Sequence, residues 1–336
     1  MSTPRENFDI IFHHEKPDYI PHLGYHAYGI RDYIVERPIM TTGFDAWGCH
    51  WISAPHSLNI THPDLKDIKF DEVCDWRTKT HIPDLDAIDF TPMVEEAKAF
   101  TNREEKMLQY VSLNGIFERS HILMGFENAL CEAMTEPEEF GTMLKAFADH
   151  KIRLFQKVYD ICHPDILVYH DDMGTQKSQF MPTDFYIKYL FPQYKRIVDA
   201  ARAMGYKYVV QHSCGRIQEL IPEWLKCGFD GWDSVMPCND LKKIKADFGD
   251  KIVFMPGLDT QSILGPSGTS RSEIEHMVVD WMELLAGDGT GLIIDSTVAY
   301  SLNPTNEKIC LEFILKHGKP FMDAKKRNVP YVPSYE

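Results

Sequence analysis

The sequence predicts an α/β protein built as a single (β/α)8 barrel, and three features of the chain lead to this fold class. From residue 107 onward, short apolar runs alternate with longer amphipathic segments, which is typical of a parallel sheet with helices between its strands. The length of 336 residues suits one such barrel with insertions. The sequence has no internal repeat and no segment of linker composition, so we expect one domain over residues 1–336.

The composition narrows the classes of function. Lys and Arg number 35 and Asp and Glu number 50, which gives a net charge of −15. An acidic surface disfavours binding to nucleic acids and to anionic membranes. No apolar run approaches the roughly 20 residues of a membrane-spanning helix, and the first residues lack the apolar core of a signal peptide. The 8 cysteines include no Cys-x-x-Cys pair, which favours reduced thiols and a cytoplasmic location.

The first third of the chain has a less regular pattern than the rest. Residues 19–24 are predicted to form the first strand, which ends at Tyr25 and His26. Residues 29–106 contain an aromatic-rich stretch at 45–51, followed by many prolines and aspartates. We expect this segment to be an irregular elaboration near the mouth of the barrel, with one helix over residues 89–100.

From residue 107 the expected strands and helices alternate. The predicted strands cover residues 107–113, 165–170, 208–214, 231–235, 252–259 and 291–295. The predicted helices cover residues 117–133, 136–162, 182–204 and 217–227, followed by a short helix from 240, a helix over 270–286 and a last helix from 303. Ser270 and Glu273 form a capping-box pattern, which marks the start of the helix over 270–286.

Polar side chains gather at the predicted ends of four strands, where the active site of an α/β barrel lies. The four ends are His170-Asp171-Asp172, Gln211-His212-Ser213-Cys214, Asp259-Thr260-Gln261 and Asp295-Ser296-Thr297. One polar end alone would be explained by a helix cap, since caps favour Asp and Ser. Four such ends with carboxylates, imidazoles and a thiol indicate a site.

His212 and Cys214 lie two residues apart on a predicted strand, so their side chains point to the same face. An imidazole and a thiolate side by side are typical zinc ligands. Two residues do not complete a metal site, and the alternative is a buried cysteine beside a hydrogen-bonded histidine.

Several motifs of this sequence, in this order and spacing, resemble the uroporphyrinogen decarboxylase superfamily. The resemblance covers nearly the whole chain and rests on His170-Asp-Asp-Met-Gly-Thr-Gln176, Pro192-Gln-Tyr-Lys-Arg196, His212-Ser-Cys-Gly215 and Pro256-Gly-Leu-Asp-Thr-Gln261. Further matches are Pro17-Asp-Tyr-Ile-Pro21, Phe117-Glu-Arg-Ser120 and Gly125-Phe-Glu127. The resemblance implies an α/β barrel of the uroporphyrinogen decarboxylase type.

This superfamily contains decarboxylases of uroporphyrinogen and methyltransferases that move a methyl group to or from a corrinoid on a separate protein. The His212-x-Cys214 pair resembles the methyltransferase branch. The arginine-rich signature of the true decarboxylases is absent, and Tyr25-His26-Ala27-Tyr28 lies near its expected place. A substrate with eight carboxylates also requires a basic pocket, whereas the predicted strand ends are acidic.

The resemblance also has implications for whether this protein binds a metal ion. Zinc-containing methyltransferases of this type add a further cysteine near the end of the seventh strand, where this chain has Asp295 instead. The resemblance therefore allows zinc with His212, Cys214 and Asp295 as its ligands, a less sulfur-rich set that would suit an oxygen substrate. The other interpretation is that no metal binds.

The predicted function is transfer of a methyl group from a small methylated donor, an aromatic methyl ether, to the cobalt(I) of a corrinoid. The chain lacks the Asp-x-His-x-x-Gly stretch of corrinoid domains, so the cobalamin cofactor is expected on a partner corrinoid protein. The leaving oxygen needs an acid, and the catalytic candidates are His212, Asp172, Asp171 and His170. Adjacent side chains on a strand point apart, so Asp171 and Asp172 are expected to have different roles, and one of them could cap the next helix.

The substrate-binding candidates are aromatic and polar residues from several predicted strand ends: Tyr25, His26, Trp47, Gln176, Asp259, Gln261 and Tyr300. For each aromatic residue the alternative is packing in the core or in a lid. Two other functions stay open, namely a uroporphyrinogen-type decarboxylase and a non-catalytic binder of corrinoid or tetrapyrrole. A homodimer is compatible with all three.

Overall fold

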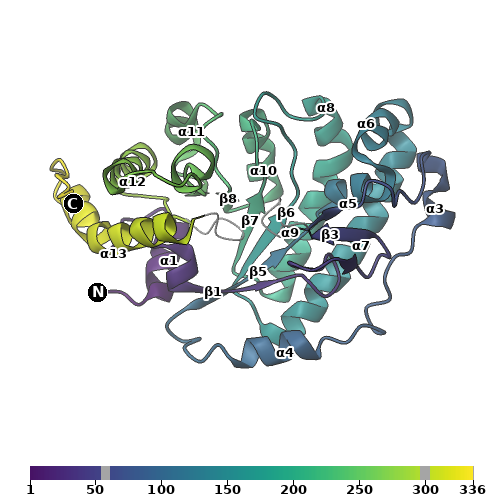
Figure 1. Ribbon diagram of the computed structural model, residues 1–336, viewed down its shortest axis with the longest axis horizontal. Helices are drawn as coiled ribbons and strands as arrows, with labels where there is room; N and C mark the ends of the chain where they lie inside the picture. Colours follow the sequence, from purple (N-terminus) through teal and green to yellow (C-terminus); the bar gives the residue numbers. More distant parts are fainter. Residues whose placement is uncertain (54–60, 296–302, 336) are drawn as a thin grey trace. The chain divides into compact units, whose positions relative to one another are not determined.

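The computed structural model describes residues 1–53, 61–295 and 303–335 (Figure 1). The chain forms two compact units. The first unit comprises residues 1–29, 102–108 and 230–336, and the second comprises residues 30–101 and 109–229. Each unit is built from more than one stretch of chain.

A parallel sheet forms the centre of the second unit. Its strands are β6 (Ile166–His170), β7 (Tyr208–His212) and, from residue 109 onward, β5 (Met107–Ser112). Val111 is paired with Val168 and Val168 with Val210, and both ladders are parallel. The first four residues of β6 and of β7 are all buried, as expected for parallel strands covered by helices. The predicted parallel arrangement of these three strands is confirmed.

Long amphipathic helices cover this sheet. Helix α7 (Pro137–Cys162) packs against α9 (Phe191–Met204), and α9 also contacts β7 (Figure 1). The helix predicted over residues 136–162 is confirmed. The segment predicted as one helix over 182–204 begins instead with the short helix α8 (Thr183–Phe185) and a π-helical turn, η3 (Tyr186–Leu190). After β7 come η4 (Gln218–Leu220) and α10 (Ile221–Cys227).

The single helix predicted over residues 117–133 is wrong, because the chain turns at Gly125. Two helices stand there, α5 (Ile116–Met124) and α6 (Phe126–Thr135). Gly125 has φ +82°, a left-handed conformation that glycine adopts at little cost and that ends an α-helix. The apolar periodicity on both sides of Gly125 hides this break in the sequence.

Residues 30–101 contribute a small antiparallel sheet to the second unit. Strand β3 (His50–Ser53) pairs with β2 (Gly43–Phe44) and with β4 (Thr61–Pro63). The short helices η2 (Val73–Asp75), α3 (Trp76–Lys79) and α4 (Thr91–Lys98) follow. The expected irregular elaboration is thus partly regular, and its position near a barrel mouth stays a prediction.

The first unit also contains parallel strands. Strand β8 (Gly231–Asp233) pairs with β9 (Val253–Met255), and parallel bridges join Phe254 to Leu292 and His22 to Ile294. The strand predicted over 291–295 is therefore reduced to isolated bridges. The strand predicted over 19–24 is reduced to the bridge at His22, which caps α2 (Leu23–His26) before β1 (Ala27–Arg31).

The remaining elements of the first unit are helical. They are α1 (Pro4–Phe12), α11 (Leu241–Phe248), the π-turn η5 (Thr260–Leu264), α12 (Arg271–Ala286) and α13 (Pro304–Lys326). The predicted capping box at the start of α12 is confirmed, since Ser270 and Glu273 satisfy each other's backbone N–H groups. Among the described residues, none of the helices combines the length and the hydropathy needed to cross a membrane.

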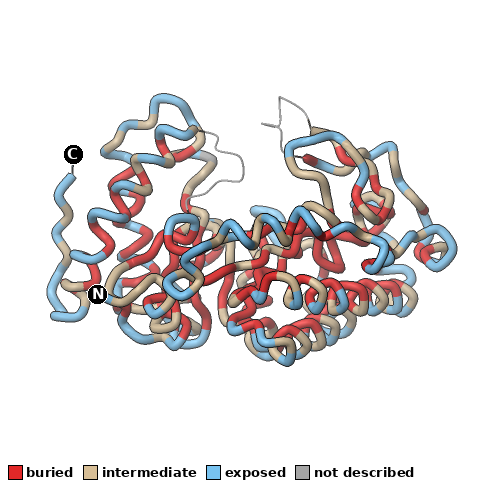
Figure 2. Tube along the Cα trace, turned by 90° about the horizontal axis from the view of Figure 1, so that it is seen from below, coloured by how far each residue is buried: buried red, intermediate tan, exposed pale blue. Residues whose placement is uncertain are grey.

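The strands and the inner sides of the helices form the buried core (Figure 2). In the second unit, charged groups are also buried. Arg119 has no exposed surface and lies between Glu36, at 2.6 Å, and Asp45, at 2.7 Å, while Lys151 contacts Glu36 at 2.8 Å. These ion pairs link residues 30–101 to α5 and α7.

Candidate active site

The two histidines at the ends of β6 and β7 lie side by side. His170 and His212 are register partners in the parallel ladder, and their rings stack with centroids 3.9 Å apart and planes 13° from parallel. Partners on adjacent parallel strands point to the same face of a sheet, which explains why the two imidazoles meet. Both side chains are partly exposed.

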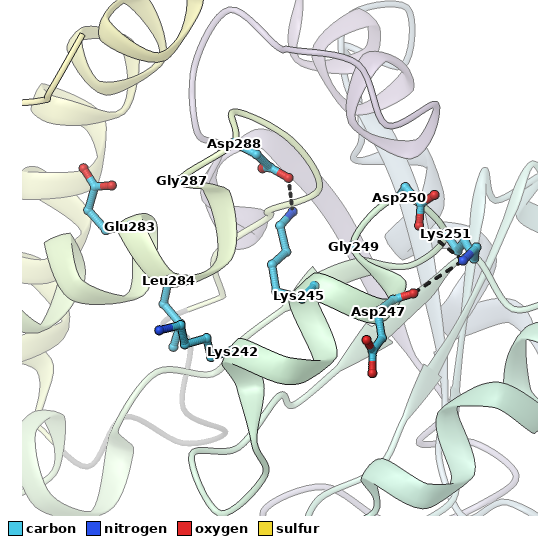
Figure 3. Close-up of a pocket in the computed structure, with 11 residues that line it drawn as sticks. Lys242, Lys245, Asp247, Gly249, Asp250, Lys251, Glu283, Leu284, Gly287 and Asp288 are labelled. Atoms are coloured by element: carbon cyan, nitrogen blue, oxygen red, sulfur yellow. Dashed lines mark hydrogen bonds and ion pairs between the residues drawn. The ribbon is translucent and has the colours of Figure 1, made fainter. Parts of the chain in front are cut away.

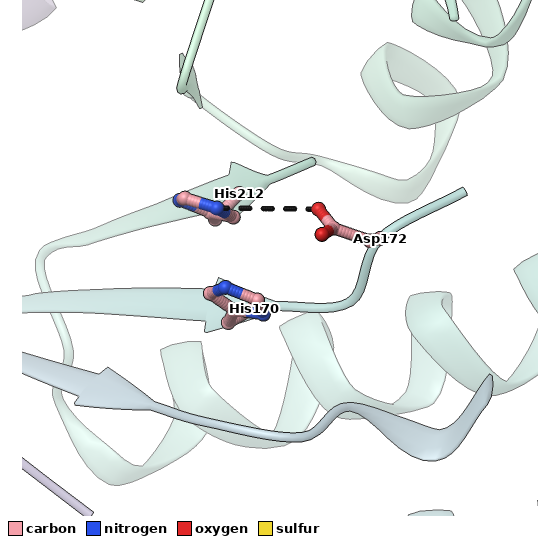
Figure 4. A group of neighbouring side chains, drawn as sticks. All are labelled: His170, Asp172 and His212. Atoms are coloured by element: carbon pink, nitrogen blue, oxygen red, sulfur yellow. Dashed lines mark ion pairs between the residues drawn. The ribbon is translucent and has the colours of Figure 1, made fainter. Parts of the chain in front are cut away.

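Asp172 completes a group of three side chains with these histidines (Figure 4). Its Oδ1 lies 4.0 Å from Nε2 of His212. One nitrogen from each histidine and one oxygen of Asp172 all lie within 4.8 Å of one another. Two imidazoles and a carboxylate form the ligand set of many catalytic metal sites, so these three residues are chemically suited to a divalent transition metal.

Glu118 orients His170 from the neighbouring helix. Its Oε2 lies 2.8 Å from Nδ1 of His170 and also accepts the backbone N–H of Gly115 at 3.2 Å. Burial disfavours the charge of Glu118, but the attraction and the hydrogen bond of His170 outweigh burial and lower the pKa of Glu118 to about 2. Glu118 was not among the predicted site residues, although its place three residues into a helix that follows a strand is a capping signal.

The backbone after β7 orients Asp172. The N–H of Cys214 donates a hydrogen bond of 2.7 Å to Oδ1 of Asp172. The thiol of Cys214 lies 3.8 Å from Nε2 of His212, so the predicted pair is adjacent in the structure. Both the imidazole of His170 and the carboxylate of Asp172 are therefore held by a second group.

The loops that follow β6 and β7 are packed closely. Ser213 Oγ accepts the backbone N–H of Met173 at 3.0 Å, and the N–H of Arg216 bonds to the carbonyl of Thr175 at 2.7 Å. Gly215 has φ +90°, and a Cβ at this position would lie 2.4 Å from the carbonyl oxygen of Gly174. This contact requires glycine and fixes the strand end that carries His212 and Cys214.

Asp171 points away from the histidines and is completely buried. It accepts the N–H groups of Phe117 and Glu118, at 3.0 and 2.8 Å, and the hydroxyl of Tyr194 at 2.7 Å. Burial, followed by the nearby charge of Glu118, raises the pKa of Asp171 to about 8 against the effect of these donors. The opposite orientations of Asp171 and Asp172 agree with strand alternation, and Asp171 anchors the start of α5.

Aromatic side chains lie beside this group of residues. His121 of α5 interacts electrostatically with Glu118 and Asp172, and burial lowers its pKa. The ring centroids of His121 and Phe126 lie 5.3 Å apart, and those of Phe126 and Phe180 lie 5.0 Å apart in an edge-to-face arrangement. Phe126 is 41% exposed, so an apolar aromatic surface is accessible here.

The other predicted residues are more scattered. In the second unit, Trp47 is buried against Phe147 and His150, and Gln176 is exposed in the loop after β6. A contribution of Trp47 to substrate binding stays a prediction. The first unit contains Tyr25, His26, Asp259, Gln261 and Asp295, and Tyr300 lies outside the described residues.

Tyr25 and Asp259 of this set have side chains that contact other residues of the first unit. Tyr25 is 50% exposed and stacks with Lys106, whose Nζ lies 5.4 Å from the ring centroid. Asp259 Oδ1 accepts the N–H of Ser262 at 2.8 Å and lines a hollow of about 510 Å³ with α12. The predicted ligand set of His212, Cys214 and Asp295 stays a prediction.

A second hollow of about 510 Å³ in the first unit lies among α11, α12 and the turns that follow them (Figure 3). Two ion pairs join charged side chains of its lining, Lys245 with Asp288 at 3.1 Å and Lys251 with Asp250 at 3.5 Å.

Comparisons with known proteins agree with this architecture. A family model described as uroporphyrinogen decarboxylase (URO-D) matches residues 63–298. A methyltransferase from Methanosarcina mazei has the same fold, with a TM-score of 0.71 and 13% identity over 94% of this chain and 99% of that one. No curated protein matches the sequence.

Two further solved structures have much lower TM-scores. A putative vitamin-B12 independent methionine synthase from Listeria monocytogenes gives 0.39, with 14% identity over 72% of each chain. An endo-β-1,4-xylanase from Gloeophyllum trabeum gives 0.42, with 11% identity over 69% of this chain and 82% of that one.

Proposed function

This chain belongs to the uroporphyrinogen decarboxylase family and has its α/β-barrel type of fold, and we propose that it is a methyltransferase. The methyl donor is a small methylated compound, with aromatic methyl ethers as the leading class. The acceptor is the cobalt(I) of a corrinoid carried by a partner protein. The group of His170, Asp172 and His212 at the ends of two adjacent parallel strands is the observation that carries this proposal.

The chemistry places one demand on these side chains. The electron pair of cobalt(I) forms the new bond to the methyl carbon, the carbon–oxygen bond breaks, and the oxygen leaves with the bonding pair. An alkoxide or phenolate leaves slowly unless a proton or a Lewis acid neutralises its charge. His212 and Asp172 are partly exposed at the strand ends, where a donor oxygen can reach them.

The surroundings of the three residues suit a flat donor. Phe126 and Phe180 form an edge-to-face aromatic pair beside His121, and such surfaces bind planar rings. Glu118 and Asp172 make this region acidic, which disfavours a donor that carries many carboxylates. The same charge argues against the alternative function as a decarboxylase of uroporphyrinogen.

A visible spectrum distinguishes the three functions. The protein is incubated with a reduced corrinoid carrier protein and a panel of methoxylated aromatics, methanol and methylamines. Methyl transfer converts the cobalt(I) spectrum to that of methylcobalt(III), with one methyl group lost from the donor per cobalt.

The other functions give different results in the same assay. A decarboxylase leaves the corrinoid spectrum unchanged and, in a separate reaction supplied with uroporphyrinogen, releases carbon dioxide. A non-catalytic binder shifts the spectrum without consuming donor. Either result contradicts the proposed function.

A further inference from the structure

We propose that His170, Asp172 and His212 are the ligands of a divalent transition-metal ion of the zinc class, with Cys214 outside the ligand set. Glu118 acts as a positioning residue that holds His170 in the tautomer needed for binding. This inference concerns the site of the proposed function, but its test measures metal binding and is independent of methyl transfer.

The donor atoms determine the class of ion. Two neutral imidazoles and one carboxylate suit Zn²⁺, Co²⁺ and Fe²⁺ better than Ca²⁺ or Mg²⁺, which prefer oxygen ligands only. The three candidate ligand atoms lie within 4.8 Å of one another at two paired strand ends, and among the described residues the sulfur of Cys214 does not belong to this group. Three protein ligands leave a position open for the oxygen of a substrate, as in catalytic zinc sites.

Glu118 determines which nitrogen of His170 is available. Its carboxylate oxygen lies 2.8 Å from Nδ1, and a carboxylate accepts hydrogen bonds, so Nδ1 carries the proton and donates it in this hydrogen bond. Nε2 of the neutral ring then keeps its lone pair for a metal. A carboxylate behind a ligating histidine is a common second contact in metal sites and strengthens binding.

Asp172 is held in a similar way. Its Oδ1 accepts the N–H of Cys214 at 2.7 Å, which fixes the carboxylate beside Nε2 of His212 at 4.0 Å. Cys214 thus contributes its backbone to the orientation of Asp172. Two of the three proposed ligands therefore have an orienting partner.

Co²⁺ and Zn²⁺ titrations of the metal-depleted full-length protein test this assignment. We expect about one equivalent of either ion, d–d absorption bands from Co²⁺, and no sulfur-to-cobalt charge-transfer band. Cys214→Ser should bind both ions as the wild type does, whereas Asp172→Asn should lose binding. Asp184→Asn, at an exposed position of α8, is the matched control.

Glu118→Gln tests the positioning role, because it keeps the size of the side chain and an acceptor for Gly115. We expect metal affinity to fall about 10- to 100-fold and the d–d bands to shift, since the tautomer of His170 is no longer fixed. Glu127→Gln, at an exposed position of α6, should change neither property. Circular dichroism confirms that each variant is folded before titration.

Three outcomes would overturn the proposal. They are a sulfur-to-cobalt band that disappears in Cys214→Ser, full metal affinity in Asp172→Asn, and stoichiometric binding that is unchanged by Glu118→Gln. The wild-type cobalt spectrum alone decides the ligand class if a variant fails to fold. Failure of methyl transfer with normal metal binding contradicts only the proposed function.

Discussion

At the scale of single residues, burial determines how much an ion pair contributes to the stability of the fold. Arg119 is completely buried between Glu36 and Asp45, and its guanidinium also stacks on Trp47 at 4.8 Å. Arg216 pairs with Glu219 at 2.6 Å, but both side chains are well exposed to water. Water screens the exposed pair, whereas removal of one partner from a buried pair leaves an uncompensated charge in the core.

Arg119→Met should therefore destabilise the protein by about 3–5 kcal/mol, because Glu36 and Asp45 lose their shared cation. Arg216→Met is the matched control and should have a much smaller effect. Urea unfolding at pH 7 measures both changes. Similar losses in the two variants would show that burial does not control the contribution of Arg119.

The burial of Asp171 leads to a prediction about how the stability of the protein depends on pH. Its pKa is 3.8 in the unfolded reference and about 8 in the folded protein, so the folded state holds the proton more tightly. The stabilising contribution of this proton is complete below about pH 4 and is lost as the pH rises through 8. Asp171→Asn cannot ionise, so the stability of the wild type relative to this variant should fall between pH 5 and pH 8.

Urea unfolding at several pH values checks this trend. Asp184→Asn, which removes an exposed carboxylate, serves as the control, and the trend with pH in Asp171→Asn should exceed any trend in this variant. A wild-type advantage over Asp171→Asn that grows with pH would contradict the assignment.

At the scale of elements, the start of α5 is attached to the end of β6. Asp171 accepts two N–H groups of the first turn of α5, and the N–H of Gly115 bonds to the carbonyl of His170 at 2.6 Å. This attachment brings Glu118 of the same turn to His170. Helix α5 thereby positions His170 at the end of β6.

Gly115→Ala tests this attachment, because a Cβ at residue 115 would lie 2.2 Å from Cβ of Asp171. We expect a loss of about 1–3 kcal/mol in stability, since the helix start must move away from β6. The cost should be smaller in an Asp171→Gly background, where the clashing Cβ is absent, and a double-mutant cycle measures the difference. Gly43→Ala is a suitable control, since a Cβ there meets no atom within 4 Å. Equal costs in both backgrounds would contradict the proposed contact.

At the scale of the whole molecule, the sequence allowed the parallel α/β class and most helix positions to be predicted, because apolar periodicity is a local signal. The break at Gly125 was missed because the apolar periodicity continues on both sides of it, and the strand predicted over 291–295 is reduced to bridges at residues 292 and 294, since tertiary contacts decide strand pairing. The site was predicted only in part for the same reason. Strand ends could be located, but the register that stacks His170 on His212 and the contact of Glu118 with His170 link residues far apart in the sequence.

The division of labour within the proposed reaction gives the last prediction. If His212 or Asp172 assists departure of the oxygen, an ether with a good leaving group needs this assistance less. His212→Ala and Asp172→Asn should therefore slow demethylation of an unsubstituted methoxyarene much more than that of its nitro-substituted analogue. Phe126→Ala removes only an exposed aromatic contact and should weaken binding of both ethers alike, with little effect on the ratio of their rates.

Rates measured at a saturating concentration of carrier protein, with the two ethers compared in every variant, decide this point. Loss of the ring contact in Phe126→Ala is expected in KM, and loss of acid assistance in His212→Ala or Asp172→Asn is expected in kcat. If His212→Ala and Asp172→Asn slow both ethers equally, these side chains only position the donor. The charge on the leaving oxygen would then be neutralised by another group, and the assignment of acid assistance to the ends of β6 and β7 would be wrong.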